Sequence, residues 1–339
     1  MKSMKLATLV AAAIAGLMAG TAQAAVGASG LKVMSKIPGP DGGWDYASFD
    51  AKKRILFVAH GDKVMAIRVD TGRVQKAFAN GAHLHAVLPV PDSDLILTTN
   101  SGDSTARLIN GKTGALVASI PTAKGPDAAV FDPKTGLILV MCGDAGEIVL
   151  IDPKAAVAVG SIVVGGALEF AAVDGKGRAY VNIEDAGKVA VIDLEARKVL
   201  DRYPLADCLA PTGLALTDDG RLIAACSNGR VKILYAATGK EIASHKIGMR
   251  PDAVLLDEGR GLAYVPSALS GDMAVIALSG AKANTVIDTV PTAIGARTGA
   301  VDLKSGRIYL PTAQYNLPVA AGQRPTTKPG TFVVLVLDR

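Results

Sequence analysis

The sequence predicts an all-β fold, a seven-bladed β-propeller with four-stranded blades, on three observations. One hairpin pattern occurs seven times: an apolar strand, a turn that usually contains Asp and Gly, and a second apolar strand. The copies recur about every 42 residues, which is the length of a four-stranded blade. Apolar residues alternate at period two between Gly-bearing turns, and no stretch after residue 24 shows helical periodicity.

The first 24 residues have the three parts of a secretory signal peptide. Lys2 and Lys5 precede an apolar run over 6–18, and small residues at 22–24 offer a cleavage site. The run is shorter than the roughly 20 residues that cross a membrane as a helix. We therefore expect cleavage after Ala24, no membrane span in the remainder, and a periplasmic or secreted protein.

The mature chain, residues 25–339, is predicted to be a single propeller domain that works as a monomer. Loss of Lys2 and Lys5 lowers the formal net charge from +5 to +3 (5 − 2), and charges of both signs are spread along the chain. Nucleic-acid binding usually needs clustered basic residues with stacking aromatics, whereas aromatics are only 4% here. The expected partner is therefore a small molecule or a periplasmic protein.

The seven hairpins set the blade count. The spacings between successive turns range from 40 to 45 residues, and the turns begin at Asp50, Pro91, Asp132, Asp174, Thr217, Asp257 and Asp302. Most units contain a second hairpin, such as residues 63–78 and 188–203, which supplies the third and fourth strands of a blade.

The two ends of the chain predict how the ring closes. The last unit finishes with TFVVLVLDR, which matches a third strand and leaves the fourth missing. The segment LKVMSKIPG near the N-terminus has the pattern of an outer strand. Pairing of residues 31–37 with 332–337 would complete the last blade and remove an open sheet edge.

These repeats resemble the YVTN-repeat β-propellers of the YncE-like type, most clearly in YVNIEDAGKVAVIDLEARKV at 180–199. GGWDY at 42–46, PDAAVFDP at 126–133, GART at 295–298 and IYLPTA at 308–313 resemble an exported bacterial subgroup of that family. The resemblance covers the whole mature chain and implies the propeller fold and export. It also implies a histidine at position 85, but it does not specify a reaction.

A ligand site is expected on one face of the ring, where the loops entering the inner strands open around the central channel. Counting five residues back from each turn gives one residue per blade, and four of the seven are acidic: Asp45, Ala86, Asp127, Glu169, Thr212, Asp252 and Arg297. Their neighbours Trp44, His83, His85, Phe170 and Thr298 are expected beside them, with His60 and Asn100 from a second set of loops.

The carboxylates allow two interpretations. Asp45 and Glu169 are candidate ligands of a divalent metal ion, which takes several oxygen ligands, and aromatic neighbours could form the floor of a small-molecule pocket. Asp127 and Asp252 each follow a proline, and for these two we favour the alternative that the carboxylate caps a turn by accepting backbone N–H groups.

The basic residues of this face add further candidates. His83 and His85 would lie on the same side of an extended segment, with His60 near them, and His85 is the candidate general base. Arg297 could bind a ligand carboxylate or pair with Asp45, and we favour the ion pair. The loop over 313–330, with Gln314, Tyr315, Arg324 and Lys328, is expected to arch over the face as a partial lid.

The three cysteines predict one disulfide and one free thiol. Cys208 enters the inner strand of the fifth unit and Cys226 ends the second strand of that unit, so that antiparallel pairing brings them to the same end. Cys142 has no such partner and is expected to be a buried thiol.

Two functions remain open from the sequence. The first is a propeller that binds a small molecule, a metal ion or a protein partner at its channel face. The second is a metal-assisted hydrolase or lyase of a lactone-like or other small organic substrate, by analogy with propeller lactonases. The only candidate cofactor is a divalent metal ion.

Overall fold

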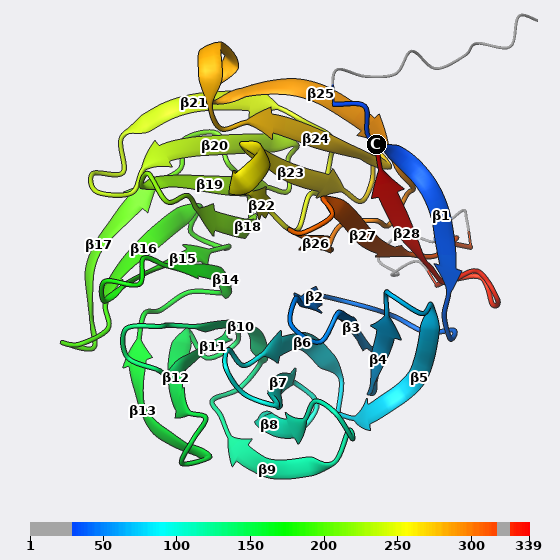
Figure 1. The fold of residues 1–339 in the computed structure, drawn as a ribbon. Helices are drawn as coiled ribbons and strands as arrows, with labels where there is room; N and C mark the ends of the chain where they lie inside the picture. Colours follow the sequence, from blue (N-terminus) through cyan, green and yellow to red (C-terminus); the bar gives the residue numbers. More distant parts are fainter. Residues whose placement is uncertain (1–28, 317–325) are drawn as a thin grey trace, which may run out of the picture.

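The strands gather into seven four-stranded antiparallel sheets that stand around a common centre, and Figure 1 shows them as a ring. The computed structural model describes residues 29–316 and 326–339. The predicted seven-bladed propeller is confirmed. The signal peptide predicted over residues 1–24 lies outside the described residues.

Each of the first four blades runs from the inner strand to the outer strand in chain order. Blade 1 consists of β2 (Ala47–Asp50), β3 (Ile55–His60), β4 (Lys63–Arg68) and β5 (Arg73–Asn80). Blade 2 consists of β6 (Leu84–Pro89), β7 (Leu95–Asn100), β8 (Thr105–Asn110) and β9 (Leu116–Pro121). Blade 3 consists of β10 (Pro126–Phe131), β11 (Ile138–Cys142), β12 (Glu147–Asp152) and β13 (Val157–Val163). Blade 4 consists of β14 (Leu168–Val173), β15 (Arg178–Ile183), β16 (Lys188–Asp193) and β17 (Lys198–Pro204).

The remaining blades include two short 3-10 helices, η1 (Glu258–Arg260) and η2 (Gly280–Lys282). Blade 5 consists of β18 (Pro211–Leu216), β19 (Arg221–Cys226), β20 (Arg230–Tyr235) and β21 (Glu241–Lys246). Blade 6 consists of β22 (Leu255–Asp257), β23 (Leu262–Ser267), β24 (Asp272–Ala277) and β25 (Thr285–Pro291). Blade 7 consists of β26 (Ala300–Asp302), β27 (Arg307–Thr312), β28 (Val333–Asp338) and β1 (Lys32–Pro38).

The apolar core lies between neighbouring blades. The second strands are covered on both faces, and every residue of β3, β11, β19 and β23 is buried. Strands buried on both faces carry continuous apolar runs instead of a simple alternation. The outer strands, such as β13, are mostly exposed along one face and tolerate charge.

Side chains close the turns between first and second strands. Asp50, Asp132 and Asp302 each accept a hydrogen bond from a backbone N–H two or three residues later. The Thr217 hydroxyl accepts the N–H of Arg221 in the same way. Asp and Thr favour such turns because their side chains hydrogen-bond to the nearby backbone. The Asp-rich repeat that revealed the fold is therefore a structural feature of the turns.

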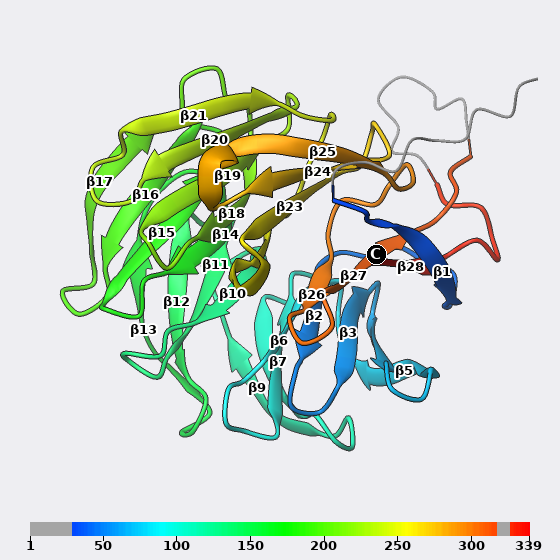
Figure 2. The ribbon, with the colours of Figure 1, turned by 45° about the horizontal axis from the view of Figure 1, so that its top comes forward.

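The ring closes as predicted, with β1 from the N-terminal end paired antiparallel to β28 from the C-terminal end. Figures 1 and 2 both show β1 along the outer side of β28. The paired segments run from Lys32 with Asp338 to Pro38 with Val333, which shifts the predicted ranges by one residue. On the turn side, Arg54 of blade 1 forms an ion pair of 2.6 Å with the buried Asp302 of blade 7.

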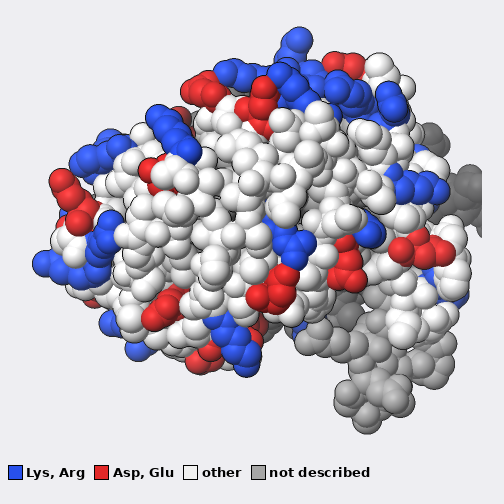
Figure 3. All heavy atoms as spheres, turned by 90° about the horizontal axis from the view of Figure 1, so that it is seen from below, with Lys and Arg blue, Asp and Glu red and all other residues white. Residues whose placement is uncertain are grey.

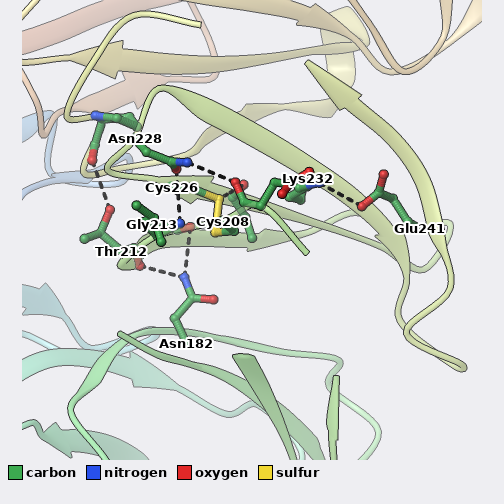
Figure 4. The surroundings of a disulfide bond; sticks show 12 residues. Asn182, Cys208, Thr212, Gly213, Cys226, Asn228, Lys232 and Glu241 are labelled. Carbon is green, nitrogen blue, oxygen red and sulfur yellow. Dashed lines mark hydrogen bonds and ion pairs between the residues drawn. A yellow bond between two sulfur atoms is a disulfide. The ribbon is translucent and has the colours of Figure 1, made fainter. Parts of the chain in front are cut away.

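The predicted disulfide between Cys208 and Cys226 is present, and Cys142 is a buried free thiol. The disulfide ties the loop before β18 to the end of β19 (Figure 4). Beside it, the Asn182 amide of blade 4 donates to the carbonyls of Thr212 (2.8 Å) and Gly213 (3.1 Å). The entry of the blade 5 inner strand is therefore held by covalent and polar contacts.

The outer wall of the ring is mixed in charge. Figure 3, which views the molecule from below Figure 1, shows Lys and Arg side chains gathered along the upper edge, Asp and Glu side chains scattered over the face, and uncharged residues over much of the rest. The outer strands β9 and β13 lie on this side in Figure 1, and they expose Leu116, Val117, Val157, Val159 and Val163. Within the described residues, no helix has the length and apolar character needed to cross a membrane.

Candidate functional site

One residue of each blade occupies the same place at the start of its inner strand. In four blades the first residue of the inner strand pairs with the last residue of the second strand: Leu84, Pro126, Leu168 and Pro211. The residue that follows each of them lies at the equivalent place in its blade. Extending this register to the other blades gives Asp45, His85, Asp127, Glu169, Thr212, Asp252 and Arg297. We call these seven residues the channel ring.

The sequence prediction was wrong at one position of the channel ring, because blade 2 contributes His85 instead of Ala86. In blade 2 the Val90 N–H donates to the Leu95 carbonyl, just as the Asp132 N–H donates to the Leu137 carbonyl in blade 3. The turn therefore starts at Val90, one residue before Pro91, and counting back from Pro91 shifted the prediction by one. His85 thus stands in the row of acidic residues.

His85 lies between a carboxylate and a hydroxyl. Its Nδ1 is 2.7 Å from Asp45 Oδ2, and its Nε2 is 3.0 Å from Ser101 Oγ. An ionised carboxylate only accepts hydrogen bonds, so Nδ1 carries the proton and Nε2 is free to accept from the Ser101 hydroxyl. That hydroxyl has a second acceptor, the His83 carbonyl oxygen at 3.2 Å. On its other side Ser101 Oγ lies 3.0 Å from His83 Nδ1. The prediction that His83 and His85 share one side is confirmed, with ring centroids 5.0 Å apart.

Asp127 completes a compact group with Asp45 and His85. One ligand atom from each lies within 4.8 Å of the others, so that these three residues could hold a metal ion. The buried Oδ1 of Asp127 lies 3.4 Å from His85 Nδ1 and accepts no hydrogen bond from the part of the chain that the structure describes. Glu169, the second predicted metal ligand, is not one of these three residues.

The capping interpretation of Asp127 and Asp252 is not supported. No backbone N–H in the described part of the chain donates to either carboxylate. Asp252 instead accepts a hydrogen bond of 2.7 Å from Arg297 Nε. The ion pair that we predicted between Arg297 and Asp45 is present only as a longer contact of 3.6 Å. The guanidinium is directed toward Asp252 and also donates to the Trp44 carbonyl.

Aromatic side chains close the channel beneath the ring. Tyr46 of blade 1 and Phe170 of blade 4 have ring centroids 5.2 Å apart, although their blades are separated along the chain. Below them a cavity of about 100 Å³ is lined mainly by apolar residues, including Ala86, Val87 and Val254. Trp44 does not join this floor, because it packs against Phe332 and Tyr315.

The carboxylates outnumber the cations around the channel, and their pKa values reflect this. Burial, with the charges of Asp127 and Asp252, raises the pKa of Glu169 to about 10. Burial and the charge of Asp45 raise the pKa of Asp127 to about 7. Asp252 rises to a pKa of about 6 through burial, which outweighs the opposing charge of Arg297. A cation in the channel mouth would relieve this repulsion.

His85 responds to the same charges. Burial lowers its pKa, but the hydrogen bond to Asp45 and the charge of Asp127 outweigh burial and raise the pKa above its usual value. Burial raises the pKa of the Tyr46 hydroxyl well above its usual value, and four ring carboxylates add to the effect. Tyr46 thus belongs to the electrostatic surroundings of the ring.

Two predicted neighbours lie elsewhere. His60 is buried, with its ring edge-on to Phe332 at 4.5 Å, so that it does not form a cluster with His83 and His85. Asn100 is fully buried, and its side chain bonds the backbone of Ala82 and Thr105. Thr298 supports the ring, because its hydroxyl donates to the Asp45 carbonyl at 2.7 Å.

Half of the predicted lid, residues 317–325 with Arg324, lies outside the described residues. At its ends, Tyr315 forms an isolated bridge with Thr327 and contacts the Trp44 ring.

Sequence reasoning missed Ser101 and Tyr46. Ser101 directly follows the second strand of blade 2, and Tyr46 directly follows Asp45. Aligning the strands of all blades residue by residue could have identified both.

Comparison with known proteins supports the fold alone. No protein-family model and no curated protein sequence matches the chain. A chain of Kuenenia stuttgartiensis hydrazine synthase is similar at TM-score 0.70 and 15% identity, over 81% of this chain and 93% of that chain. A chain of the mitotic checkpoint complex has TM-score 0.76 and 10% identity, over 100% and 99%. U3-55K has TM-score 0.75 and 11% identity, over 91% and 99%. At these identities the chain shares a β-propeller fold with proteins of diverse roles.

Proposed function

We propose that the protein is an exported YVTN-type propeller whose channel face binds a small molecule carrying a positive charge. The observation that carries this proposal is the excess of carboxyl groups over guanidinium groups in the channel ring, which contains Asp45, Asp127, Glu169 and Asp252 but, of the basic residues, only Arg297 beside His85. Export is supported by the Cys208–Cys226 disulfide, since disulfides persist in oxidising compartments.

The geometry favours a cation over an anion. Arg297 is already engaged by Asp252 and the Trp44 carbonyl, so that it has little capacity to attract a ligand carboxylate. Asp127 retains a buried oxygen without a hydrogen-bond donor. An alkylammonium ion would donate hydrogen bonds to such oxygens, whereas a quaternary ammonium ion would interact with them through its charge alone. The aromatic rings of Tyr46 and Phe170 suit either cation.

A divalent metal ion is the second candidate occupant, favoured by the close group of Asp45, His85 and Asp127. Metal-assisted hydrolysis would need an ion at that group, with Glu169 as a protonated acid beside it. The two occupants differ in what they contact. A metal ion would take the nitrogen of His85, whereas an organic ammonium would bind to carboxylates and aromatic rings and leave that nitrogen free.

Thermal unfolding in the presence of small probes tests the proposal. We expect tetramethylammonium and short alkylammonium ions to raise the midpoint, and acetate and neutral alcohols at equal ionic strength to leave it unchanged, because ligands of the native state stabilise it. Asp127→Asn should weaken the effect, whereas Asp144→Asn, an exposed site outside the ring, should preserve it.

The metal arm uses Mn²⁺ and Zn²⁺ under the same conditions. An effect of these ions that is lost in His85→Gln, without any effect of ammonium ions, would favour the metal site. Equal effects of acetate and ammonium ions would contradict the proposal.

A further inference from the structure

We propose that Ser101 is a nucleophile, activated by His85 and oriented by Asp45, for acyl transfer from small esters. This inference goes beyond binding at the channel ring: it is compatible with an organic ammonium ion there and incompatible with a metal ion on His85. It rests on a continuous chain of contacts, from Asp45 Oδ2 to His85 Nδ1 at 2.7 Å and from His85 Nε2 to Ser101 Oγ at 3.0 Å.

The order of atoms gives each residue a role. A carboxylate on Nδ1 holds the imidazole in the tautomer whose Nε2 is free to accept a proton, and the hydroxyl sits on that nitrogen. Asp45 is itself held in place, since the Thr298 hydroxyl donates to its carbonyl and Arg297 lies 3.6 Å from Oδ1. Ser101 is only half-buried, so that a small ester can reach its oxygen.

The reaction balances with water as the second reactant. Ser101 Oγ bonds to the acyl carbon as its proton moves to His85 Nε2. The ester C–O bond then breaks, and His85 returns the proton to the departing alcohol. Water attacks the acyl-serine by the same route, which releases the acid and restores the hydroxyl.

The surroundings predict slow turnover. The N–H groups of Ser101 and Gly102 donate to the carbonyls of His83 and Ala82, so that they do not form an oxyanion hole. His83 Nδ1 lies 3.0 Å from Oγ, and it can donate there only in the tautomer that carries the proton on Nδ1. Loss of one oxyanion donor costs about 100-fold or more in other enzymes, which makes covalent labelling the more sensitive test.

Blade 5 provides a matched control. Ser227 follows β19 as Ser101 follows β7, and both backbone N–H groups donate to the residue before the inner strand. At the position of His85, however, blade 5 has Thr212. The two serines therefore share their backbone setting and differ in the imidazole.

The experiment is labelling of the mature protein with a fluorophosphonate probe, in which Ser Oγ bonds to phosphorus and fluoride leaves, followed by peptide mass spectrometry. We expect an adduct on Ser101 at least about tenfold faster than on Ser227. His85→Gln should slow it at least about 100-fold, Asp45→Asn at least about tenfold, and Ser227→Ala should not alter it. Each variant is compared at equal folded fraction, measured by circular dichroism.

Zn²⁺ adds a readout that separates this inference from the proposed binding function. A metal ion on His85 Nδ1 would leave the proton on Nε2, so that Zn²⁺ should slow labelling and a chelator should not. Ser101→Ala should leave the ammonium effect on unfolding intact. The inference is overturned if Ser101 is labelled no faster than Ser227 in the wild-type protein, a comparison that needs no variant. It is also overturned if labelling of Ser101 is unchanged in folded His85→Gln.

Discussion

Replacing Glu169 by glutamine should stabilise the fold at neutral pH while it weakens cation binding. The pKa of Glu169 is raised from 4.5 to about 10 by burial and neighbouring carboxyl groups. The folded protein therefore keeps a proton that the unfolded chain releases above pH 4.5. In that range the wild-type protein loses stability as pH rises, because the unfolded state binds fewer protons.

The size of the effect follows from the shift. Each pH unit contributes about 1.4 kcal/mol, so that three units between 4.5 and pH 7.5 set a ceiling of about 4 kcal/mol. Neighbouring carboxyl groups share part of this penalty, and the glutamine amide also costs free energy to bury. We expect Glu169→Gln to gain about 2 kcal/mol at pH 7.5, or about 3 °C in the unfolding midpoint of a protein of this size.

The assay is urea unfolding of the wild type and Glu169→Gln at pH 5, 6 and 7.5. The difference in the free energy of unfolding should grow with pH and be near zero at pH 5. Glu195→Gln, at an exposed turn, is the matched control and should change little at any pH. A difference that is constant across this range would refute the reasoning.

Three further predictions concern the scaffold. Replacing Cys208 and Cys226 by serine should lower the free energy of unfolding by about 3 kcal/mol, since the disulfide closes a loop with a sequence separation of 18. An unchanged denaturant midpoint would contradict this prediction. Cys142 should react with iodoacetamide at pH 8 only after denaturation, because burial raises its pKa to about 11; rapid native modification would show that the thiol is accessible. Deleting residues 29–38 should leave the edge of β28 open and cause concentration-dependent association in light scattering, whereas a stable monomer would contradict the closure argument.

The fold was predictable because its signals are local. Turns such as those at Asp50 and Asp132 need an Asp or Thr side chain to close them, and the same need recurs in most blades. The closure was predictable from an unmatched strand at each end. It shifted by only one residue, because β28 is a continuous apolar run and β1 alternates between exposed and half-buried residues over much of its length.

The site was only partly predictable, because its contacts cross the channel. The repeat predicted Asp45, His85 and Arg297 on one face of the ring. The hydrogen bond of Arg297 to Asp252 was not predictable, because it depends on how the guanidinium is oriented between two blades. The contact of His85 with Ser101 joins the first and second strands of blade 2. Predicting it required the pairing register of these strands, which was misplaced by one residue because the turn was taken to start at Pro91. Periodicity locates a blade, but it does not orient the side chains within the channel.

The most direct test of a cation site at the channel ring is the number of protons released when a cation binds. Isothermal titration of residues 25–339 with tetramethylammonium at pH 6.5, repeated in buffers of different ionisation enthalpy, measures that number. We predict net proton release, because Asp127 and Glu169 have pKa values raised to about 7 and about 10 and must lose protons to face a cation. We also predict smaller release in Glu169→Gln. Binding without proton release, or with equal release in the variant, would contradict a cation site at the ring.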